Sequence, residues 1–178
     1  MDAAVWVIEL VLLILPAYFA NSVPVLLGGG APIDGGKKWS DGQRLFGDGK
    51  TVRGFFAGVL AGVAIGALEG LLLAGGNWEI YQGGAPTYVL AGFLLGCGAM
   101  AGDLLGSFIK RRQGLARGKP SLAMDQLLFL ALALLAAYPI AGGLLTTGAV
   151  LFLSVLTYFV HVGANVVANR LGLKKVPW

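Results

Sequence analysis

Five long apolar stretches most constrain what this chain can fold into. They cover residues 4–27, 55–75, 87–108, 122–142 and 148–169. Each is about 21 to 24 residues long, and a helix of that length spans the roughly 30 Å hydrocarbon core of a bilayer. We therefore predict an all-α integral membrane protein with five transmembrane helices, and we treat residues 1–178 as a single membrane domain.

The alternative of a soluble helical bundle conflicts with the pattern and with the composition. Helices of soluble bundles carry a polar face with a period of 3.6 residues. The stretch LLFLALALLAAY, residues 127–138, has no such polar face. Only 12% of the residues are charged, whereas about a quarter is usual in soluble domains. A secretory signal peptide is also not expected, because Asp2 and Glu9 occupy a region that would be basic in one.

The basic residues predict the orientation in the membrane. They fall in the segment 28–53, in the segment 110–121 and in the tail after residue 169, whereas 76–86 and 143–147 contain none. Basic loops remain in the cytoplasm, so we expect the loops 28–53 and 110–121 to be cytoplasmic, the N-terminus outside and the C-terminus inside. The net charge of +4 then reflects topology, and we do not expect nucleic-acid binding.

Glycines recur every four residues in two of the predicted helices. They are Gly54, Gly58, Gly62, Gly66 and Gly70 in one, and Gly98, Gly102 and Gly106 in the other. Small residues at this spacing let helix backbones approach closely, so we interpret them as packing surfaces. Pro24 interrupts the first helix shortly after Asn21, where it either exposes polar groups to a ligand or makes a kink that neighbouring helices satisfy.

The first cytoplasmic segment, 28–53, is longer than most unstructured connections and ends in GDGKTVRG. Gly49, Lys50 and Thr51 match the last part of a P-loop, but Arg44 stands where the first glycine should be. Backbone N–H groups beside Lys50 and Arg53 can still bind phosphate oxygens. We favour a phosphate-binding loop over a segment that is basic only for reasons of topology.

Acidic residues occur near the expected cytoplasmic ends of two adjacent helices. Asp103 shares a helix face with Ser107, Lys110 and Arg111, and lies roughly 12 Å from Arg111 along the axis. Asp125, on the next helix, reaches a similar depth. Carboxylates inside a membrane need a partner, and a pair of them suits Mg²⁺ with substrate phosphates. The alternative pairs each aspartate with nearby Lys or Arg and involves no metal.

A polar stripe runs along the last predicted helix through Tyr158, His161, Asn165 and Asn169. Such residues either hold helices together or line the site near its head-group end. The single cysteine, Cys97, excludes a disulfide framework.

GDLLGSFIKRR followed by LAMDQLLF resembles the C-terminal signature of the CTP-dependent phosphatidate cytidylyltransferases. Together with FGDGKTVRG, NSVPVL and five segments, the chain most closely resembles the archaeal branch of that superfamily, the CDP-archaeol synthases. The resemblance covers nearly the whole chain. It implies CMP transfer from CTP to a prenyl-ether glycerol phosphate, with release of pyrophosphate, at the cytoplasmic membrane.

Carried over by position, the resemblance makes Asp103 and Asp125 the ligands of Mg²⁺ and catalytic residues together with Lys110. It also implies that Ser107, Lys110 and Arg111 lie on the phosphate side. Together with the residues of the loop and of the first helix discussed above, the candidates for nucleotide and phosphate binding are Asn21, Pro24, Asp48, Gly49, Lys50, Thr51, Arg53, Ser107 and Arg111. The third carboxylate of the bacterial pattern is absent, which leaves Asp48, Asp41 or a lipid phosphate to complete the ligand set. A homodimer is left open.

Two other classes of function remain as alternatives. A small cation-coupled transporter would also carry intramembrane acidic residues, but its polar residues should continue through the membrane, and here they cluster at one end. A glycerol-phosphate acyltransferase would need neither CTP nor metal-binding carboxylates.

Overall fold

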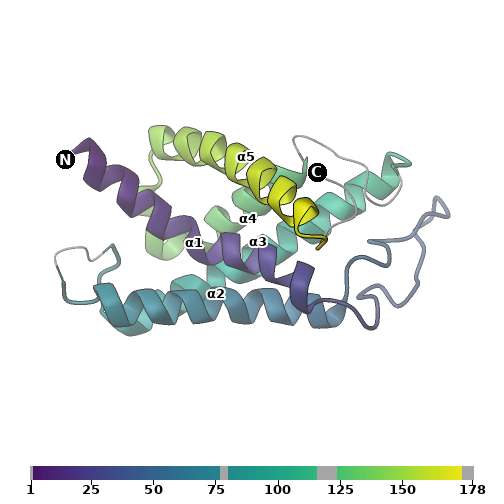
Figure 1. The fold of residues 1–178 in the computed structure, drawn as a ribbon, viewed down its shortest axis with the longest axis horizontal. Helices are drawn as coiled ribbons and strands as arrows, with labels where there is room; N and C mark the ends of the chain where they lie inside the picture. The colour runs from purple at the N-terminus through teal and green to yellow at the C-terminus, as the bar shows by residue number, and fades with distance from the viewer. Residues whose placement is uncertain (1, 77–79, 116–123, 174–178) are drawn as a thin grey trace.

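The computed structural model describes residues 2–76, 80–115 and 124–173, with residues 124–126 described by their backbone alone. These residues form a bundle of five long helices (Figure 1). The helices are α1 (Ala3–Leu27), α2 (Val52–Leu73), α3 (Ala85–Arg112), α4 (Met124–Ala141) and α5 (Thr147–Arg170), with a short 3-10 turn, η1 (Gly142–Leu144), before α5. Within the described part of the chain, five helices are long and apolar enough to cross a membrane, which confirms the predicted all-helical, five-helix class.

α3 is the central helix, and glycines bring α2 against it. A Cβ atom on Gly62 would lie 2.6 Å from the carbonyl oxygen of Gly92, and one on Gly70 would lie 2.9 Å from the carbonyl oxygen of Ala85. Real side chains do not fit at such distances, so the two backbones touch directly. The glycine stripe of α2 is therefore a packing surface, as its spacing predicts.

On its other side α3 packs equally closely against α4. A Cβ atom on Gly98 would lie 2.6 Å from Cα of Ala133, and one on Gly102 would lie 2.5 Å from Cα of Phe129. Moving four residues forward along α3, from Gly98 to Gly102, moves the contact four residues backward along α4, from Ala133 to Phe129. The two helices are therefore antiparallel. The buried residues of α1, α3 and α4 form one continuous core beside these contacts.

α1 contains two prolines, Pro16 and Pro24, and the second lies close to α2. Pro24 has no N–H, so the carbonyl of Ala20 loses its helical donor. That carbonyl faces α2, where a Cβ atom on Gly58 would lie 2.7 Å from it. Pro24 itself packs near Gly54, at the start of α2.

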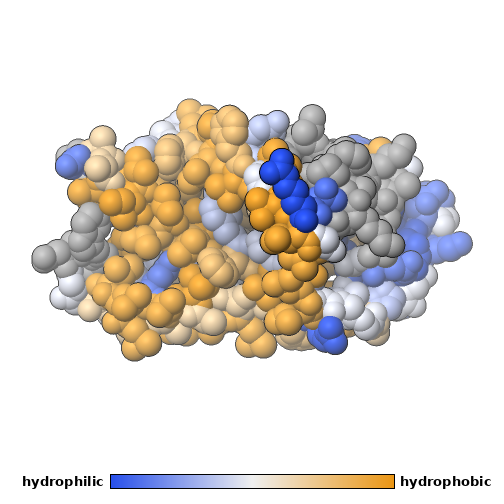
Figure 2. Space-filling model, viewed as in Figure 1, coloured by the Kyte–Doolittle hydropathy of each residue, from blue (hydrophilic) through white to orange (hydrophobic). Residues whose placement is uncertain are grey.

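α5 lies at the periphery of the bundle. Only 11% of the residues in its apolar stretch are buried inside the protein, whereas 50% are buried in the corresponding stretch of α3. Figure 2 shows apolar side chains covering the helices, while hydrophilic residues gather at the end where the segment 28–51 lies. An apolar band with a polar end is the surface expected of a protein embedded in a bilayer.

Two helix ends differ from the predicted spans by more than two residues. α3 continues to Arg112, beyond the predicted end at residue 108, and includes the first residues of the expected loop 110–121. Lys110, Arg111 and Arg112 lie in its last turn, where cations interact favourably with the helix dipole. α2 begins at Val52, because Thr51 caps its first turn, so the preceding loop ends at residue 51.

Candidate active site

The segment 28–51, which we call the first loop, has a defined fold at one end of the bundle. Its two ends pair with each other, since the N–H of Ile33 donates to the carbonyl of Lys50 at 2.8 Å and the N–H of Val52 donates to the carbonyl of Ala31 at 3.1 Å. Its middle turns back on itself between Lys37 and Leu45. The residues just before α2 are therefore held by the residues that follow α1.

Asp34 is the buried centre of the first loop. Its side chain is 0% exposed. The carboxylate accepts hydrogen bonds from the Arg44 guanidinium at 2.6 and 3.3 Å, and from the N–H groups of Gly36, Phe46 and Gly47 at 3.0 to 3.1 Å. Burial by itself raises the pKa of Asp34, but these hydrogen bonds outweigh burial and hold the pKa well below its usual range.

Aromatic and basic side chains fix the first loop to the last turns of α3. The rings of Trp39 and Phe46 pack on Phe108, with centroids 5.4 and 6.4 Å away. The guanidinium of Arg112 lies over the same ring, donates to the carbonyl of Arg44 at 2.6 Å and forms an ion pair with Asp41 at 2.8 Å. The loop is thereby held against the basic end of α3.

This docking brings Lys50 to Asp103. The Nζ atom of Lys50 lies 2.6 Å from both carboxylate oxygens of Asp103, and both side chains are about one-third exposed or less, at 27% and 33%. A turn from Gly47 to Lys50 precedes the pair, with the N–H of Lys50 donating to the carbonyl of Gly47 at 3.1 Å. As the alternative to a metal site, the sequence predicted basic residues close to each aspartate along the chain as its ionic partners. For Asp103 the partner is instead a lysine from the loop.

The other predicted residues of α3 lie around this pair. Ser107 is buried, one turn beyond Asp103, and Lys110 lies in the last turn. The side chain of Arg111 reaches Gly47, where a Cβ atom would lie 4.0 Å from Cδ of the arginine. The Nε–H of Arg111 is buried and has no hydrogen-bond partner among the residues that the structure describes. The structure thus brings the glycine-rich turn and the basic end of α3 together, as the phosphate-binding hypothesis requires.

Three predicted residues make structural contacts at the junction of α1 and α2. The hydroxyl of Thr51 accepts hydrogen bonds from the N–H groups of Gly54 and Gly29. The guanidinium of Arg53 donates to the carbonyl of Leu27 at 2.7 Å and to that of Gly28 at 2.5 Å. Pro24 packs in the same junction, and its carbonyl accepts from the N–H of Gly28 at 2.9 Å. Phosphate binding by these residues stays a prediction.

Two other acidic residues, Asp48 and Asp125, were predicted to belong to the site. Asp48 is 69% exposed and forms an ion pair with Arg44 at 2.6 Å, while the adjacent Gly49 is exposed in the turn. The side chain of Asp125 lies outside the described residues, but its backbone belongs to α4. Extending the register of α3 and α4 by one turn sets the backbone of Asp125 level with Gly106, roughly 4.5 Å along the axis from Asp103. This backbone register is compatible with the similar depth predicted for the two aspartates.

No group of three or more potential metal-ligating side chains occurs among the described residues. The donor chemistry around Asp103 nevertheless suits Mg²⁺, which commonly binds one or two carboxylates and takes its remaining oxygens from water and substrate phosphates. Asp103 offers two partly accessible oxygens beside basic groups that can bind those phosphates. Magnesium binding by Asp103 and Asp125 stays a prediction.

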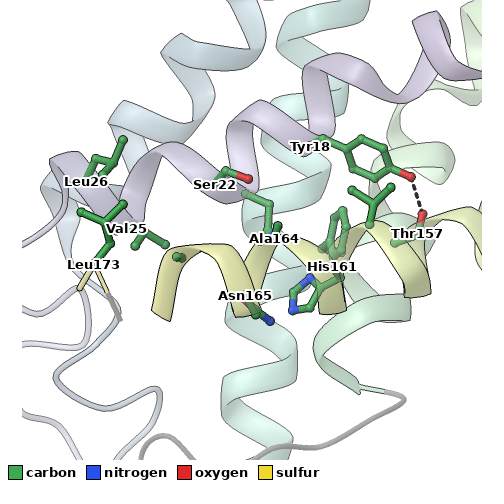
Figure 3. Close-up of a pocket in the computed structure, with 13 residues that line it drawn as sticks. Tyr18, Ser22, Val25, Leu26, Thr157, His161, Ala164, Asn165 and Leu173 are labelled. Carbon is green, nitrogen blue, oxygen red and sulfur yellow. Dashed lines mark hydrogen bonds between the residues drawn. The ribbon is translucent and has the colours of Figure 1, made fainter. Parts of the chain in front are cut away.

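A pocket of about 200 Å³ opens between α1 and α5 (Figure 3). Its lining is mostly apolar, with polar groups from Asn21, Ser22, His161 and Asn165. At one end the hydroxyl groups of Tyr18 and Thr157 are 2.8 Å apart and hydrogen-bonded. The predicted residue Asn21 therefore lies in this pocket, on the side of α1 that faces α5.

Asp34 and Phe108, which organise the site, were not predicted from the sequence. The local signal for Asp34 was present, because Asp followed by two glycines favours a turn in which the side chain binds the backbone two residues on. Phe108 had no such signal, since its role depends on aromatic residues of the distant first loop.

Nearly the whole chain is similar to proteins of one known family. The family model described as CarS-like CDP-archaeol synthase matches residues 4–178. A CDP-archaeol synthase of Pyrococcus horikoshii is 53% identical over 165 residues, which are 93% of this chain and 93% of that protein. A CDP-archaeol synthase of Methanococcus aeolicus is 43% identical, with 97% of each chain covered.

A solved structure is also similar. It is described as an intramembrane enzyme for archaeal membrane lipid biosynthesis, and it matches with a TM-score of 0.75 and 38% identity over 88% of this chain and 92% of that one. These matches confirm the family predicted from the sequence and, with it, an intramembrane enzyme of the cytidylyltransferase class. The chain belongs to the CDP-archaeol synthase family.

Proposed function

We propose that this protein transfers CMP from CTP to 2,3-di-O-geranylgeranylglycerol 1-phosphate, giving a CDP-lipid and pyrophosphate in a Mg²⁺-dependent reaction. The observation that carries the proposal is the contact between Lys50 and Asp103. It joins a glycine-rich, basic loop to an acidic helix position at the end of an apolar bundle. The basic loop can bind the phosphates of a nucleoside triphosphate, and the end of the apolar bundle can bind a lipid phosphate.

The chemistry is a phosphoryl substitution. An oxygen of the lipid phosphate forms a bond to the α-phosphorus of CTP, the bond from that phosphorus to the bridging oxygen breaks, and pyrophosphate leaves with the electron pair. A phosphate monoester is largely dianionic at neutral pH, so its oxygen is already a nucleophile. Catalysis then depends on bringing two anions together in line and on stabilising the charge that develops on the leaving group.

Residues at this end of the bundle would supply these effects. Lys50 and the buried, unsatisfied Nε–H of Arg111 would bind phosphate oxygens, with Lys110 on the same end of α3. Asp103 and Asp125 would hold the Mg²⁺ ion, which would neutralise phosphate charge and orient the triphosphate. Gly47 and Gly49 leave room for phosphates to approach the backbone of the turn.

The lipid substrate would reach this end of the bundle through the pocket between α1 and α5. A volume of about 200 Å³ is below the usual range of about 300 to 1,000 Å³ for ligand pockets, so it would hold only part of a two-chain lipid. The rest would remain in the bilayer. The positive-inside rule supports a cytoplasmic position for the basic end and the site, and an outside N-terminus.

The test uses purified protein in detergent with CTP and a dialkyl glycerol phosphate, with and without Mg²⁺. We expect a CDP-lipid and pyrophosphate in equal amounts and only with the metal. Asp103→Asn and Lys50→Met should lower turnover by at least about 100-fold, the scale of a lost transition-state contact. Asp2→Asn is a matched control, because it makes the same chemical change at the N-terminal end of α1, whereas the first loop follows the C-terminal end of that helix.

Two results would refute the proposal. One is product formation at the wild-type rate by the Asp103→Asn variant. The other is a lipid product formed from an acyl donor without CTP, which would indicate the acyltransferase alternative. Family membership argues against that alternative and against the transporter.

A further inference from the structure

We propose that Asp34 is a positioning residue, which fixes the turn 47–50 so that Lys50 reaches Asp103. Asp34 lies 16 positions before Lys50 in the sequence and makes no contact with it through its side chain. Its effect on turnover rests on the proposed function, whereas its effect on the position of Lys50 does not.

The hydrogen bonds of Asp34 hold the beginning of that turn. Oδ2 accepts from the N–H of Phe46 and from the N–H of Gly47, each at 3.0 Å. Gly47 has φ +90°, a conformation that suits glycine, and its carbonyl accepts from the N–H of Lys50. Anchoring Gly47 therefore anchors the first residue of the turn that carries Lys50.

The backbone of the residue before Asp34 holds the other end of the same turn. This residue, Ile33, donates its N–H to the carbonyl of Lys50 at 2.8 Å. Arg44 donates hydrogen bonds to both carboxylate oxygens of Asp34. It also donates to the carboxylate of Asp48, which lies inside the turn. The turn is thus bound to the Asp34 region at its beginning, its middle and its end.

Anchoring matters because lysine has a long and flexible side chain. Its four-carbon stem adopts many rotamers, so the position of its ammonium depends on the position of the backbone that carries it. The neighbouring acidic residues cannot replace Asp34, since the side chains of Asp41 and Asp48 are 37% and 69% exposed. Asp34 is fully covered and satisfied on both oxygens.

Asp34→Asn removes this anchor without changing the size of the side chain. Each carboxylate oxygen accepts from at least two donors, so an NH₂ group in place of either oxygen would face N–H groups rather than acceptors. We expect the turn to separate from Asp34 and Lys50 to leave Asp103 for part of the time.

The experiment measures the acylation rate of Lys50 by an N-hydroxysuccinimide ester, read by mass spectrometry in the full-length protein in detergent. The exposed Lys37 and Lys38 of the same loop serve as internal references. Asp34→Asn should raise the relative rate at Lys50 by about tenfold, equivalent to about 1.4 kcal/mol of lost pairing. Asp103→Asn should raise it at least as much. Asp2→Asn, with the same charge change at the start of α1 and away from the first loop, should leave it unchanged.

An unchanged rate at Lys50 in Asp34→Asn, beside a raised rate in Asp103→Asn, would overturn the proposal. So would an unchanged rate in Asp103→Asn, because Lys50 would then not be paired. If Asp34→Asn does not yield folded protein, Asp34→Glu decides. It keeps the charge but displaces the carboxylate by one methylene, and we expect a smaller rise, whereas no rise would again contradict the proposal.

The same variants separate this inference from the proposed function. If Asp34 acts through Lys50, Asp34→Asn should lower CDP-lipid formation in the wild-type background and have no further effect in Lys50→Met. Equal losses in both backgrounds would show that Asp34 acts by another route. If the wild-type protein forms no CDP-lipid, the proposed function fails, and the labelling result still tests the positioning of Lys50.

Discussion

The contact of Gly102 with α4 allows a quantitative prediction about the packing of the site. A Cβ atom on Gly102 would lie 2.5 Å from Cα of Phe129, whereas carbon atoms in contact are separated by about 3.5 to 4.0 Å. Gly102→Ala must therefore move α3 and α4 apart by roughly 1 Å. Both partners are backbone, so no side chain can rotate to relieve the clash.

The expected loss of stability is a balance of two terms. Overpacking of this kind costs about 1 to 3 kcal/mol, and the better helix propensity of alanine returns up to about 1 kcal/mol. We expect a net loss of about 1 to 2 kcal/mol, equivalent to a melting temperature about 2 to 8 °C lower. Because Asp103 is the next residue, the same displacement would shift a proposed metal ligand, and a 1 Å error can lower turnover by about 100-fold.

The single cysteine of the chain provides the assay. Cys97 is partly buried in α3, so a fluorogenic thiol reagent reports unfolding in detergent as this residue becomes accessible. Gly163→Ala is the matched control, since within the described part of the chain no atom lies within 4 Å of a Cβ at that position in α5. A melting temperature of Gly102→Ala equal to or above that of Gly163→Ala would refute the reasoning.

Three further predictions concern stability. Thr51→Ala should lower the free energy of unfolding by about 1 kcal/mol, measured by melting, because it removes the cap of α2, and Thr51→Ser should restore most of it. Glu69 is 5% exposed and neither carboxylate oxygen has a partner among the residues described, so Glu69→Met should raise the free energy of unfolding by about 1 to 3 kcal/mol; a lower melting temperature would contradict this. The pKa of Asp34 is depressed, so its ionised form stabilises the fold above pH ~4 and this contribution is lost as the pH falls. The melting temperature of Asp34→Asn should therefore fall less on acidification than that of the wild type.

The sequence predicts the helices and their close contacts because both depend on local pattern. Apolar length determines the spans, and glycines four residues apart determine which faces touch, as Gly62 and Gly102 do. The pairing of Lys50 with Asp103 could not be predicted in this way. The two residues are 53 positions apart, and their contact depends on how the first loop folds and docks on Phe108. The nearer candidates, Lys110 and Arg111, follow Asp103 on its own helix by seven and eight residues, which is roughly 10 to 12 Å along the axis.

The two halves of the bundle differ in how much they can adjust, and this difference suits a reaction between a nucleotide and a lipid. α2, α3 and α4 touch through their backbones at glycines, so small displacements there meet a steep rise in energy and the charged groups of α3 are held in place. α5 is mostly exposed on the surface of the bundle and meets α1 through side chains around the pocket, with Tyr18 and Thr157 joined by a hydrogen bond. Side chains can change rotamer where backbones in contact cannot separate. In the proposed reaction, a two-chain lipid would therefore enter between α1 and α5 without disturbing Asp103 or the turn that carries Lys50.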